Sequence, residues 1–542
     1  MTFARTSLPY LHGRSALIAL VGVCLLLATG AWGVETRITV YQQAVAAEAA
    51  KDPALAAFYR ERGYKGIWTG RGGRDASRRR AFLAALGKAG SHALPLKRYD
   101  PEMVRAALRS ARTPAERGRL EVRMSRLFLQ YAQDVQSGII REPRRIDSGI
   151  VRKTPRRDRL KLLQAFAGSS PAGFLKALPP KSPEYVRLMK AGLQLERKIA
   201  RGGFGPQVPA RSLKPGQSGG AVVALRNRLT AMGYMRRSRS GTYDARLQKA
   251  VQLFQHEHGL PANGIADRAT IAEINRPARY RLQQVVVAME RERWLNFRRG
   301  KRHVLVNITD FTAKIIDDGK ITFETRAVVG ATEDDRRTPE FSDVMEFMVV
   351  NPTWNVPRSI TVKEYLPLLK RNPNAVSHLQ LVDAQGRRVG RSGVDFTRYD
   401  ERSFPFNMKE PPSRSNALGL VKFMFPNPYN IYLHDTPAKK LFGHSVRAYS
   451  HGCIRLQRPF DFAYALLRPQ MSNPEDHFQK VLATGRETTI PLKDPVPVHL
   501  IYRTAFTTAK GRVQFRRDIY GRDAKIFRAL SRAGVALPEV RG

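Results

Sequence analysis

The spacing of the hydrophobic residues changes near residue 301, and this change limits the folds that the chain can adopt. Upstream, apolar residues recur every three or four positions, as in residues 127–135, which is the spacing of one face of an α-helix. Downstream, residues 303–308 and 313–316 alternate in the manner of half-buried strands. The pair Asp318-Gly319 follows and tolerates the positive φ angles of a tight hairpin turn. The sequence therefore predicts an α+β fold, helical first and β-rich afterwards.

The chain is too long for one domain. Its 542 residues exceed the roughly 250–300 residues at which a single hydrophobic core stops growing. A stretch rich in Gly and Pro over residues 201–217 is typical of a linker. It leads into a compact segment that continues to residue 277, with a helical face made of Val222, Leu225 and Leu229. A small segment of this kind buries little core alone, so we expect it to dock on its neighbours.

A long polar stretch interrupts the strand pattern of the second half. Alternation stops near Asn351 and resumes with residues 420–425. Segments of this length inside a compact domain are usually lids, binding loops or disordered regions. We therefore expect residues 355–420 to form a mobile cover over a site in the β-rich part. Strand patterning returns in residues 497–515, so we expect the C-terminus to extend the sheet.

The first residues indicate export. Residues 15–34 carry no charge and follow Arg5, His12 and Arg14, which is the pattern of a signal peptide or of an uncleaved membrane anchor. The stretch is close to the roughly 20 residues that span a bilayer, so both alternatives stay open. We expect residues 35–52 to form a helical or loose tether behind it.

The chain is strongly basic. It has 93 Lys and Arg residues against 46 Asp and Glu residues, a formal net charge of +47. In a cytosolic protein this balance would first indicate nucleic acid. For an exported chain we expect no nucleic-acid partner, because anionic lipid head groups and the carboxylates of cell-wall peptides are the acidic partners available there. The alternative is a basic, solvated surface without a partner.

Cysteine usage singles out one residue. The chain has two cysteines, and Cys24 lies in the apolar N-terminal segment, so Cys453 is the only thiol of the folded part. A lone Cys in an exported protein is buried and inert, paired to another chain, or a nucleophile. His434 lies upstream at the end of a short strand pattern, and an imidazole beside a thiol lowers its pKa and shuttles its proton. A zinc site from His434, His451 and Cys453 is an alternative, but it lacks an obvious fourth ligand.

The residues around this thiol carry a family resemblance. Ser450-His451-Gly452-Cys453 begins sixteen positions after His434, and this pattern resembles the signature of L,D-transpeptidases with a YkuD-like catalytic domain. Those enzymes cross-link bacterial peptidoglycan through a cysteine acyl-enzyme. The resemblance implies Cys453 as the nucleophile and His434 as the general base, with no metal and no organic cofactor.

The resemblance also suggests a set of binding residues. The peptide N–H groups around Gly452 and Cys453 are the implied oxyanion donors. Many members have Asn where this chain has Arg455, which leaves the role of that residue open. The candidates for contact with substrate or oxyanion are Gly452, Ser450, His451, Arg455 and Tyr432.

The resemblance covers most of residues 53–525 and implies a domain order. Residues 35–200 are similar to a helical scaffold domain, and residues 205–277 to a three-helix peptidoglycan-binding module. Residues 301–485 then form the β-rich catalytic domain, in which Gly330 and Thr338-Pro339 match family positions and residues 355–420 resemble an inserted capping subdomain. Residues 1–34 are the signal or anchor, and residues 486–542 a C-terminal β extension.

The expected function is peptidoglycan cross-linking in cell-wall biogenesis. The resemblance implies an exported, periplasmic enzyme that uses tetrapeptide stems as donor and acceptor, with the inner-membrane surface as a second contact. Three alternatives stay open at this point. They are an L,D-carboxypeptidase or endopeptidase of the same fold, an enzyme that attaches envelope proteins to peptidoglycan, and a peptidoglycan-binding protein without activity.

Overall fold

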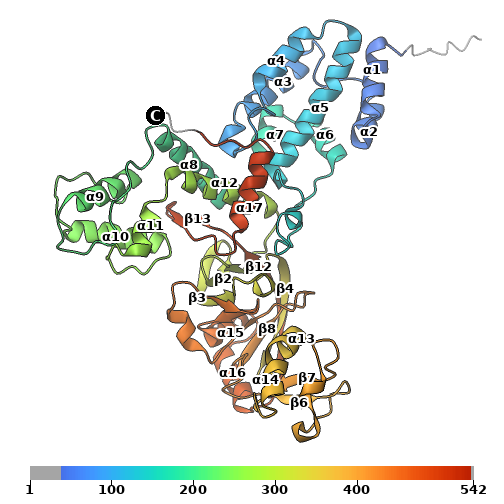
Figure 1. Ribbon diagram of the computed structural model, residues 1–542. Helices are drawn as coiled ribbons and strands as arrows, with labels where there is room; N and C mark the ends of the chain where they lie inside the picture. Colours follow the sequence, from blue (N-terminus) through green and yellow to red (C-terminus); the bar gives the residue numbers. More distant parts are fainter. Residues whose placement is uncertain (1–37, 539–542) are drawn as a thin grey trace, which may run out of the picture.

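The computed structural model describes residues 38–538 and has three tiers (Figure 1). Helices α1 to α7 form the upper tier, a layer around α8, α12 and α17 lies in the middle, and a β-rich part lies below. The predicted α+β fold class is confirmed by this order of elements. The expected signal or anchor at residues 15–34 lies outside the described residues. Within residues 38–538, no helix is long and apolar enough to cross a membrane.

The upper tier is a bundle around the longest helix, α5. A capping box starts α5: the Thr113 hydroxyl accepts from the Glu116 amide at 3.2 Å, and the Glu116 carboxylate accepts from the Thr113 amide at 2.9 Å. Trp68 stacks on Phe166 at 5.1 Å between ring centroids within the bundle core. The helices are α1 (Val40–Ala49), α2 (Pro53–Glu61), α3 (Gly73–Leu86), α4 (Pro101–Ser110), α5 (Pro114–Ser137), α6 (Arg159–Gly168) and α7 (Pro171–Ala177).

Helix α1 corrects one expectation. The sequence suggested a helical or loose tether over residues 35–52; the segment contains a helix, but it is no tether, because Val45 and Ala49 are fully buried in the core of the upper tier. The Ala- and Glu-rich composition concealed an apolar face that packs on α5. The helix is therefore part of the scaffold.

The middle tier joins the other parts. Helices α8 (Pro183–Ile199) and α12 (Ala278–Trp294) pack side by side, and a small module of α9 (Gly220–Met232), α10 (Ala245–Glu257) and α11 (Arg268–Ile274) has its own core. Arg291 on α12 binds Glu340 of the β-rich part and, at 2.8 Å, Asp523 near the C-terminus. All three charges are buried. Buried ion pairs of this kind fix geometry more than they add stability.

The lower tier is a nine-stranded sheet that closes on itself. Its order is β10-β3-β11-β9-β8-β4-β12-β1-β2, and β2 also pairs with β3. One face packs on the hydrophobic core of this tier together with α15 (Pro459–Leu467) and α16 (Pro474–Ala483). The strands are β1 (Arg302–Asn307), β2 (Thr312–Asp317), β3 (Lys320–Gly330), β4 (Ser342–Val350), β8 (Val421–Met424), β9 (Leu433–His434), β10 (Ala448–Ser450), β11 (Ile454–Leu456) and β12 (Thr488–Ile501).

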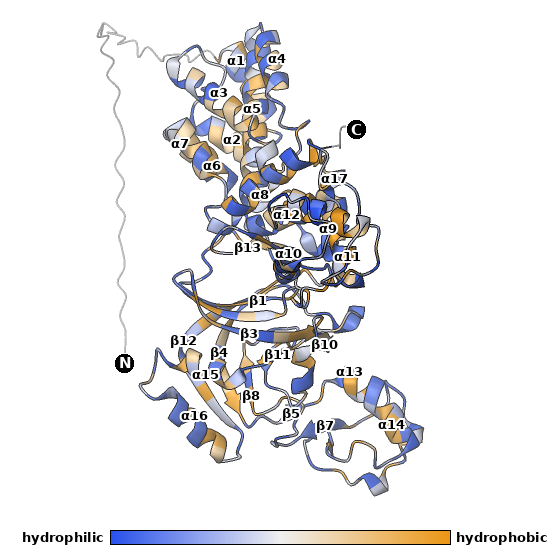
Figure 2. Ribbon diagram, turned by 90° about the vertical axis from the view of Figure 1, so that its left-hand side faces the viewer, coloured by the Kyte–Doolittle hydropathy of each residue, from blue (hydrophilic) through white to orange (hydrophobic). Residues whose placement is uncertain are grey.

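The polar stretch before β8 folds as a subdomain with its own core. Buried residues such as Leu366, Phe396 and Met408 pack together there. They are spread thinly along the sequence, so no local period revealed them. The elements of this capping subdomain are β5 (Trp354–Asn355), α13 (Arg358–Ile360), a π-helix (Thr361–Tyr365), α14 (Leu366–Arg371), β6 (Gln380–Val382), the 3₁₀ turns Arg391–Gly393 and Phe396–Arg398, and β7 (Asn407–Glu410). In both views it lies at the end of the β-rich part away from the three-helix module (Figures 1 and 2).

The C-terminal segment extends the sheet only through β12, so the expectation for residues 497–515 needs a correction in part. Strand β12 lies inside the sheet, but β13 (Ala505–Thr507) and β14 (Val513–Phe515) form a separate two-stranded sheet. Ala505 and Phe515 pack on residues of α8 and α12. The chain then ends in α17 (Arg522–Arg532), whose Ile526 and Leu530 pack against α12. This amphipathic helix was not predicted, because arginines outnumber the few apolar residues that form its buried face.

Candidate active site

The strand register brings the motif residues to one face of the sheet. β11 runs parallel to β9 with Arg455 opposite His434, and β8 places Lys422 opposite His434 on the other side. Residues directly opposite each other share a face, and side chains alternate along a strand. His434 and Arg455 therefore lie on one face, while Leu433 and Ile454 point into the core. Cys453 and Tyr432 immediately precede these two short strands.

The turn that carries the thiol is held by hydroxyl groups. The Ser450 hydroxyl donates to the Cys453 carbonyl at 2.5 Å and accepts from the Gly452 amide at 3.2 Å. From the other side, the Thr338 hydroxyl donates to the Gly452 carbonyl at 2.7 Å and accepts from the Gly330 amide at 2.8 Å. These bonds connect Ser450, Gly452, Gly330 and Thr338, so four of the positions noted in the sequence form one supporting unit.

Two of these positions require glycine. Gly452 has φ +112°, in a region that L side chains rarely adopt, and a Cβ there would lie 3.0 Å from the Ile431 side chain. A Cβ on Gly330 would overlap the backbone of Arg336 and Thr338. Close backbone packing thus explains Gly330, and the positive φ angle explains Gly452.

The turn leaves one amide open. The Gly452 amide is already bound by Ser450, whereas the Cys453 amide makes no hydrogen bond to any residue of the described chain. Of the two amides expected as oxyanion donors, only the Cys453 N–H is therefore left without an intramolecular acceptor in the described residues.

The Cys453 thiol is held in its protonated form. It is half-buried and donates weakly to the Asn430 carbonyl at 3.4 Å. Burial raises the thiol pKa to about 11, although hydrogen bonding from Tyr432 and the positive charge of Arg455 act in the opposite direction. A neutral thiol therefore needs a proton acceptor before it can attack.

His434 is a buried, neutral imidazole. Burial lowers its pKa to about 3, and Arg455 lowers it further. The carbonyls of Asp435 and Leu418 oppose this shift, but Nδ1 has no full hydrogen bond within residues 38–538. A neutral imidazole at physiological pH has a lone pair available for a proton. The Asp435 carboxylate itself is engaged by the Leu420 amide at 3.0 Å and by Lys439.

Tyr432 and Arg455 complete the surroundings of the thiol. The Tyr432 ring meets the His434 ring edge-to-face at 5.6 Å. Its pKa is raised well above the usual range, first by burial and then by the charge of the neighbouring Cys453. Burial lowers the pKa of Arg455, its charge interacts with Cys453, and its Nε has no partner in the described chain. The structure thus gathers four of the predicted site residues.

His451 points elsewhere. Its Nε2 lies 2.6 Å from the Glu364 carboxylate, which also binds Arg336 at 2.8 Å. Glu364 belongs to the π-helix of the capping subdomain, so His451 joins that subdomain to the thiol turn. Across residues 38–538, no group of three or more His, Cys, Asp or Glu side chains is arranged to hold a metal ion. The structure gives the suggested zinc set no support.

Sequence reasoning missed several contributors. Glu364, Leu418 and Asn430 all touch site residues, yet they lie in loops or in the polar insertion. No spacing or motif marks them, because their contacts are made across the fold.

Taken together, these features define a β-rich domain that presents one thiol, one neutral imidazole and a glycine turn on a single sheet face. Family models agree with this class: residues 301–496 match the "L,D-transpeptidase catalytic domain". Residues 53–191 match the "Scaffold domain", and residues 218–274 match the "Putative peptidoglycan binding domain". Residues 301–496 are thus similar to the catalytic domain of L,D-transpeptidases.

Individual relatives match parts of the chain. A protein of Haemophilus influenzae named "Putative L,D-transpeptidase" is 34% identical over 225 residues, which cover 41% of this chain and 45% of that protein. The chain thus spans about half the length of the curated relative that it matches. Crystal structures of L,D-transpeptidases from Xylanimonas cellulosilytica and Stackebrandtia nassauensis are each 15% identical and cover 55% of this chain. The matches include 98% and 97% of the two crystallised chains, respectively, with TM-scores of 0.16 and 0.21.

Proposed function

We propose that this chain is an L,D-transpeptidase that works through a cysteine acyl-enzyme. The observation that carries the proposal is the gathering of Cys453, Tyr432, Arg455 and a neutral His434 on one face of the sheet. The nucleophile and its base are the two groups that acyl transfer from a peptide requires. The proposed donor is a tetrapeptide stem of peptidoglycan.

Acylation begins with a neutral pair. The Cys453 sulfur attacks the carbonyl carbon that precedes the terminal D-Ala, and its proton passes to His434. The Cys453 N–H donates to the oxyanion, a contribution worth about 10²–10³ in rate for such donors. When the C–N bond breaks, the D-Ala amine takes the proton from the imidazolium. A thioester and free D-Ala result.

Deacylation repeats the steps with an acceptor amine. The amine of a second stem attacks the thioester carbon, neutral His434 takes its proton, and the sulfur leaves and is reprotonated. Acid–base help of this kind is worth roughly 10²–10⁴ in rate. Arg455 and Tyr432 stabilise negative charge on the sulfur during both steps, since both lower the thiol pKa in the resting site.

The substrate and the location are part of the proposal. A module that matches a peptidoglycan-binding family precedes the catalytic domain, and the N-terminal residues have an export pattern. We infer a periplasmic enzyme that acts on peptidoglycan. The same thioester with water as acceptor would make it a carboxypeptidase instead, so product analysis must accompany the test.

The test is covalent trapping followed by product weighing. We expect a carbapenem to add to the wild-type chain and not to Cys453→Ala, as measured by intact mass. His434→Ala should acylate far more slowly, whereas His378→Ala, an exposed histidine of the capping subdomain, should acylate normally. With disaccharide-tetrapeptide, cross-linked dimers are expected. Equal acylation of His434→Ala and wild type would contradict the assigned base, and tripeptide without dimers would show a hydrolase.

A further inference from the structure

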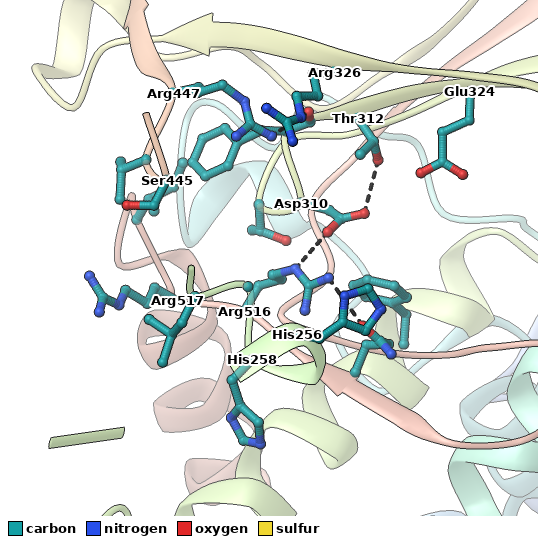
Figure 3. Close-up of a pocket in the computed structure, with 18 of the residues that line it drawn as sticks. His256, His258, Asp310, Thr312, Glu324, Arg326, Ser445, Arg447, Arg516 and Arg517 are labelled. Carbon is teal, nitrogen blue, oxygen red and sulfur yellow. Dashed lines mark hydrogen bonds and ion pairs between the residues drawn. The ribbon is translucent and has the colours of Figure 1, made fainter. Parts of the chain in front are cut away.

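A cleft lies between the three-helix module and the sheet. The cleft has a volume of about 800 Å³. Its walls come from residues 256–261 of the module, strands β2 and β3, residues 443–447 and the hairpin of β13 and β14 (Figure 3). Cys453 and His434 are not among the residues that line it. The cleft is thus distinct from the thiol site.

The cleft is rich in positive charge. Two carboxylates face five cationic side chains, and both are occupied: Asp310 binds Arg516 at 2.6 Å and Glu324 binds Lys314 at 3.4 Å. The three remaining cations are Arg326, Arg447 and Arg517. None of these three has a carboxylate partner within the described chain.

Two of these arginines are available to a ligand. Arg447 is buried and donates to the carbonyls of Ala327, His444 and Phe311, so it builds the wall. Arg326 is exposed and makes one bond, to the Phe442 carbonyl at 3.2 Å. Arg517 is exposed and makes no hydrogen bond to the described residues. Figure 3 shows Arg326 next to Arg447 on one side, with Arg516 and Arg517 on the other side.

The cleft and the thiol share a face of the sheet. Thr312 lies opposite Arg326 on β2 and β3, and Val328 lies opposite Arg455 on β3 and β11. Because side chains alternate along β3, Arg326 and Val328 point to the same side as Arg455. From Arg326 to Gly330, beside the thiol turn, the strand rises roughly 13 Å at about 3.3 Å per residue. An extended tetrapeptide spans a similar distance, roughly 13 Å.

We propose that this cleft binds a carboxylate-bearing peptidoglycan fragment through Arg326 and Arg517 and guides its stem to Cys453. Arginine forks match carboxylates in two-pronged hydrogen bonds. Threonine and serine hydroxyls of the cleft offer further hydrogen bonds to sugar and peptide groups. The subsite deepens the proposed function and rests on it. It also gives the module a role, since residues 256–261 form one wall.

The test measures binding without turnover. In the full chain carrying Cys453→Ala, disaccharide-tetrapeptide is titrated by calorimetry. Adding Arg326→Gln and Arg517→Gln should weaken binding at least tenfold. A matched pair, Arg80→Gln and Arg119→Gln, removes the same charge from exposed helix positions of the scaffold and should leave binding unchanged. If the cleft variant and the scaffold variant bind disaccharide-tetrapeptide with equal affinity, the proposal is overturned.

Further arms identify the recognised group. A fragment with amidated carboxyl groups should bind the unaltered cleft as weakly as the free acid binds the altered one. If the amidated fragment binds the unaltered cleft as tightly as the free acid does, carboxylate recognition is overturned. Full displacement of the free acid by millimolar inorganic phosphate would overturn it as well. In a chain that keeps Cys453, the variant with Arg326→Gln and Arg517→Gln should be acylated by a carbapenem at the same rate as wild type. Because Cys453→Ala cannot be acylated, the binding experiments test the cleft independently of the proposed activity. They remain decisive even if that activity is not found.

Discussion

At the scale of single residues, the site rests on two opposed pKa shifts. Burial raises the pKa of the Cys453 thiol to about 11 and lowers that of the His434 imidazole to about 3. The proton therefore stays on sulfur in the free enzyme, and the imidazole stays neutral. In the proposed reaction, sulfur attack and proton transfer to His434 would therefore occur together.

Thiol alkylation should report this pKa. The rate of iodoacetamide modification of Cys453 should rise about tenfold per pH unit between pH 7 and 9, because only the thiolate reacts. Arg455→Gln removes a positive charge that lowers the thiol pKa and should slow alkylation at pH 9. Arg468→Gln, at an exposed arginine, is the control. A rate plateau below pH 9 would show that the thiol is more acidic than the structure indicates.

A second prediction concerns Thr338, whose hydroxyl joins Gly330 to Gly452. Thr338→Val keeps the shape but leaves a buried amide and a buried carbonyl unpaired, at a cost of about 1–3 kcal/mol. We expect lower stability in urea unfolding and slower carbapenem acylation. Thr338→Ser retains the hydroxyl and should restore both. Unchanged acylation in Thr338→Val would mean that the turn holds itself through Ser450.

At the scale of elements, the capping subdomain reaches into the site. Leu418 and Trp354 belong to its core and contact His434 and Tyr432, respectively. Its π-helix is tied to the thiol turn through Glu364. The subdomain is folded by its own core, so any motion would be that of a body on hinges. The mobile cover expected from the sequence stays a prediction.

Glu364→Ala should loosen that connection. Its two contacts, with Arg336 and His451, are partly exposed, and exposed polar pairs of this kind are worth about 0.2–1 kcal/mol each. Opening of the subdomain should therefore become roughly two- to thirtyfold more frequent. Hydrogen exchange of residues 358–371 should quicken accordingly, while Glu401→Ala, at an exposed site of the same subdomain, should not change it. Equal exchange in both variants would show that the core alone holds the subdomain in place.

At the scale of the whole molecule, the three-helix module docks through a buried histidine. His258 stacks on Phe254 at 3.8 Å between ring centroids and lies 5.4 Å from the Phe515 ring of the C-terminal hairpin. Burial lowers its pKa to about 3, Arg281 and Arg516 act in the same direction, and Glu273 opposes them. The imidazole is neutral in the folded chain.

Acid should therefore weaken this docking. The unfolded imidazole, with a pKa near 6.5, binds a proton that the folded one rejects, so stability is fully present above pH 6.5 and falls as the pH drops toward 3. Between pH 7.5 and 4.5 the loss is about 2–3 kcal/mol for one such group. We expect the stability difference between wild type and His258→Gln, measured by urea unfolding, to shrink by this amount. A difference independent of pH would contradict the buried neutral imidazole.

The sequence alone determined the local features of this protein. Hydrophobic period placed the helices and strands, and the pattern around His434 and Cys453 indicated one site and one family. These signals are local, because a helix face, a turn or a motif is written in neighbouring residues. These local signals were enough to predict which regions of the chain are helical and which are β-rich.

Only the tertiary structure decided how distant segments combine. Helix α1 packs in the helical bundle, and the polar insertion has its own hydrophobic core. The C-terminal hairpin packs on α8 and α12 instead of pairing with the main sheet. The link from Thr338 to Gly452, the contact of Glu364 with His451 and the basic cleft all join residues far apart in the chain. Such contacts depend on packing, charge and burial in three dimensions, and no period or spacing along the chain encodes them.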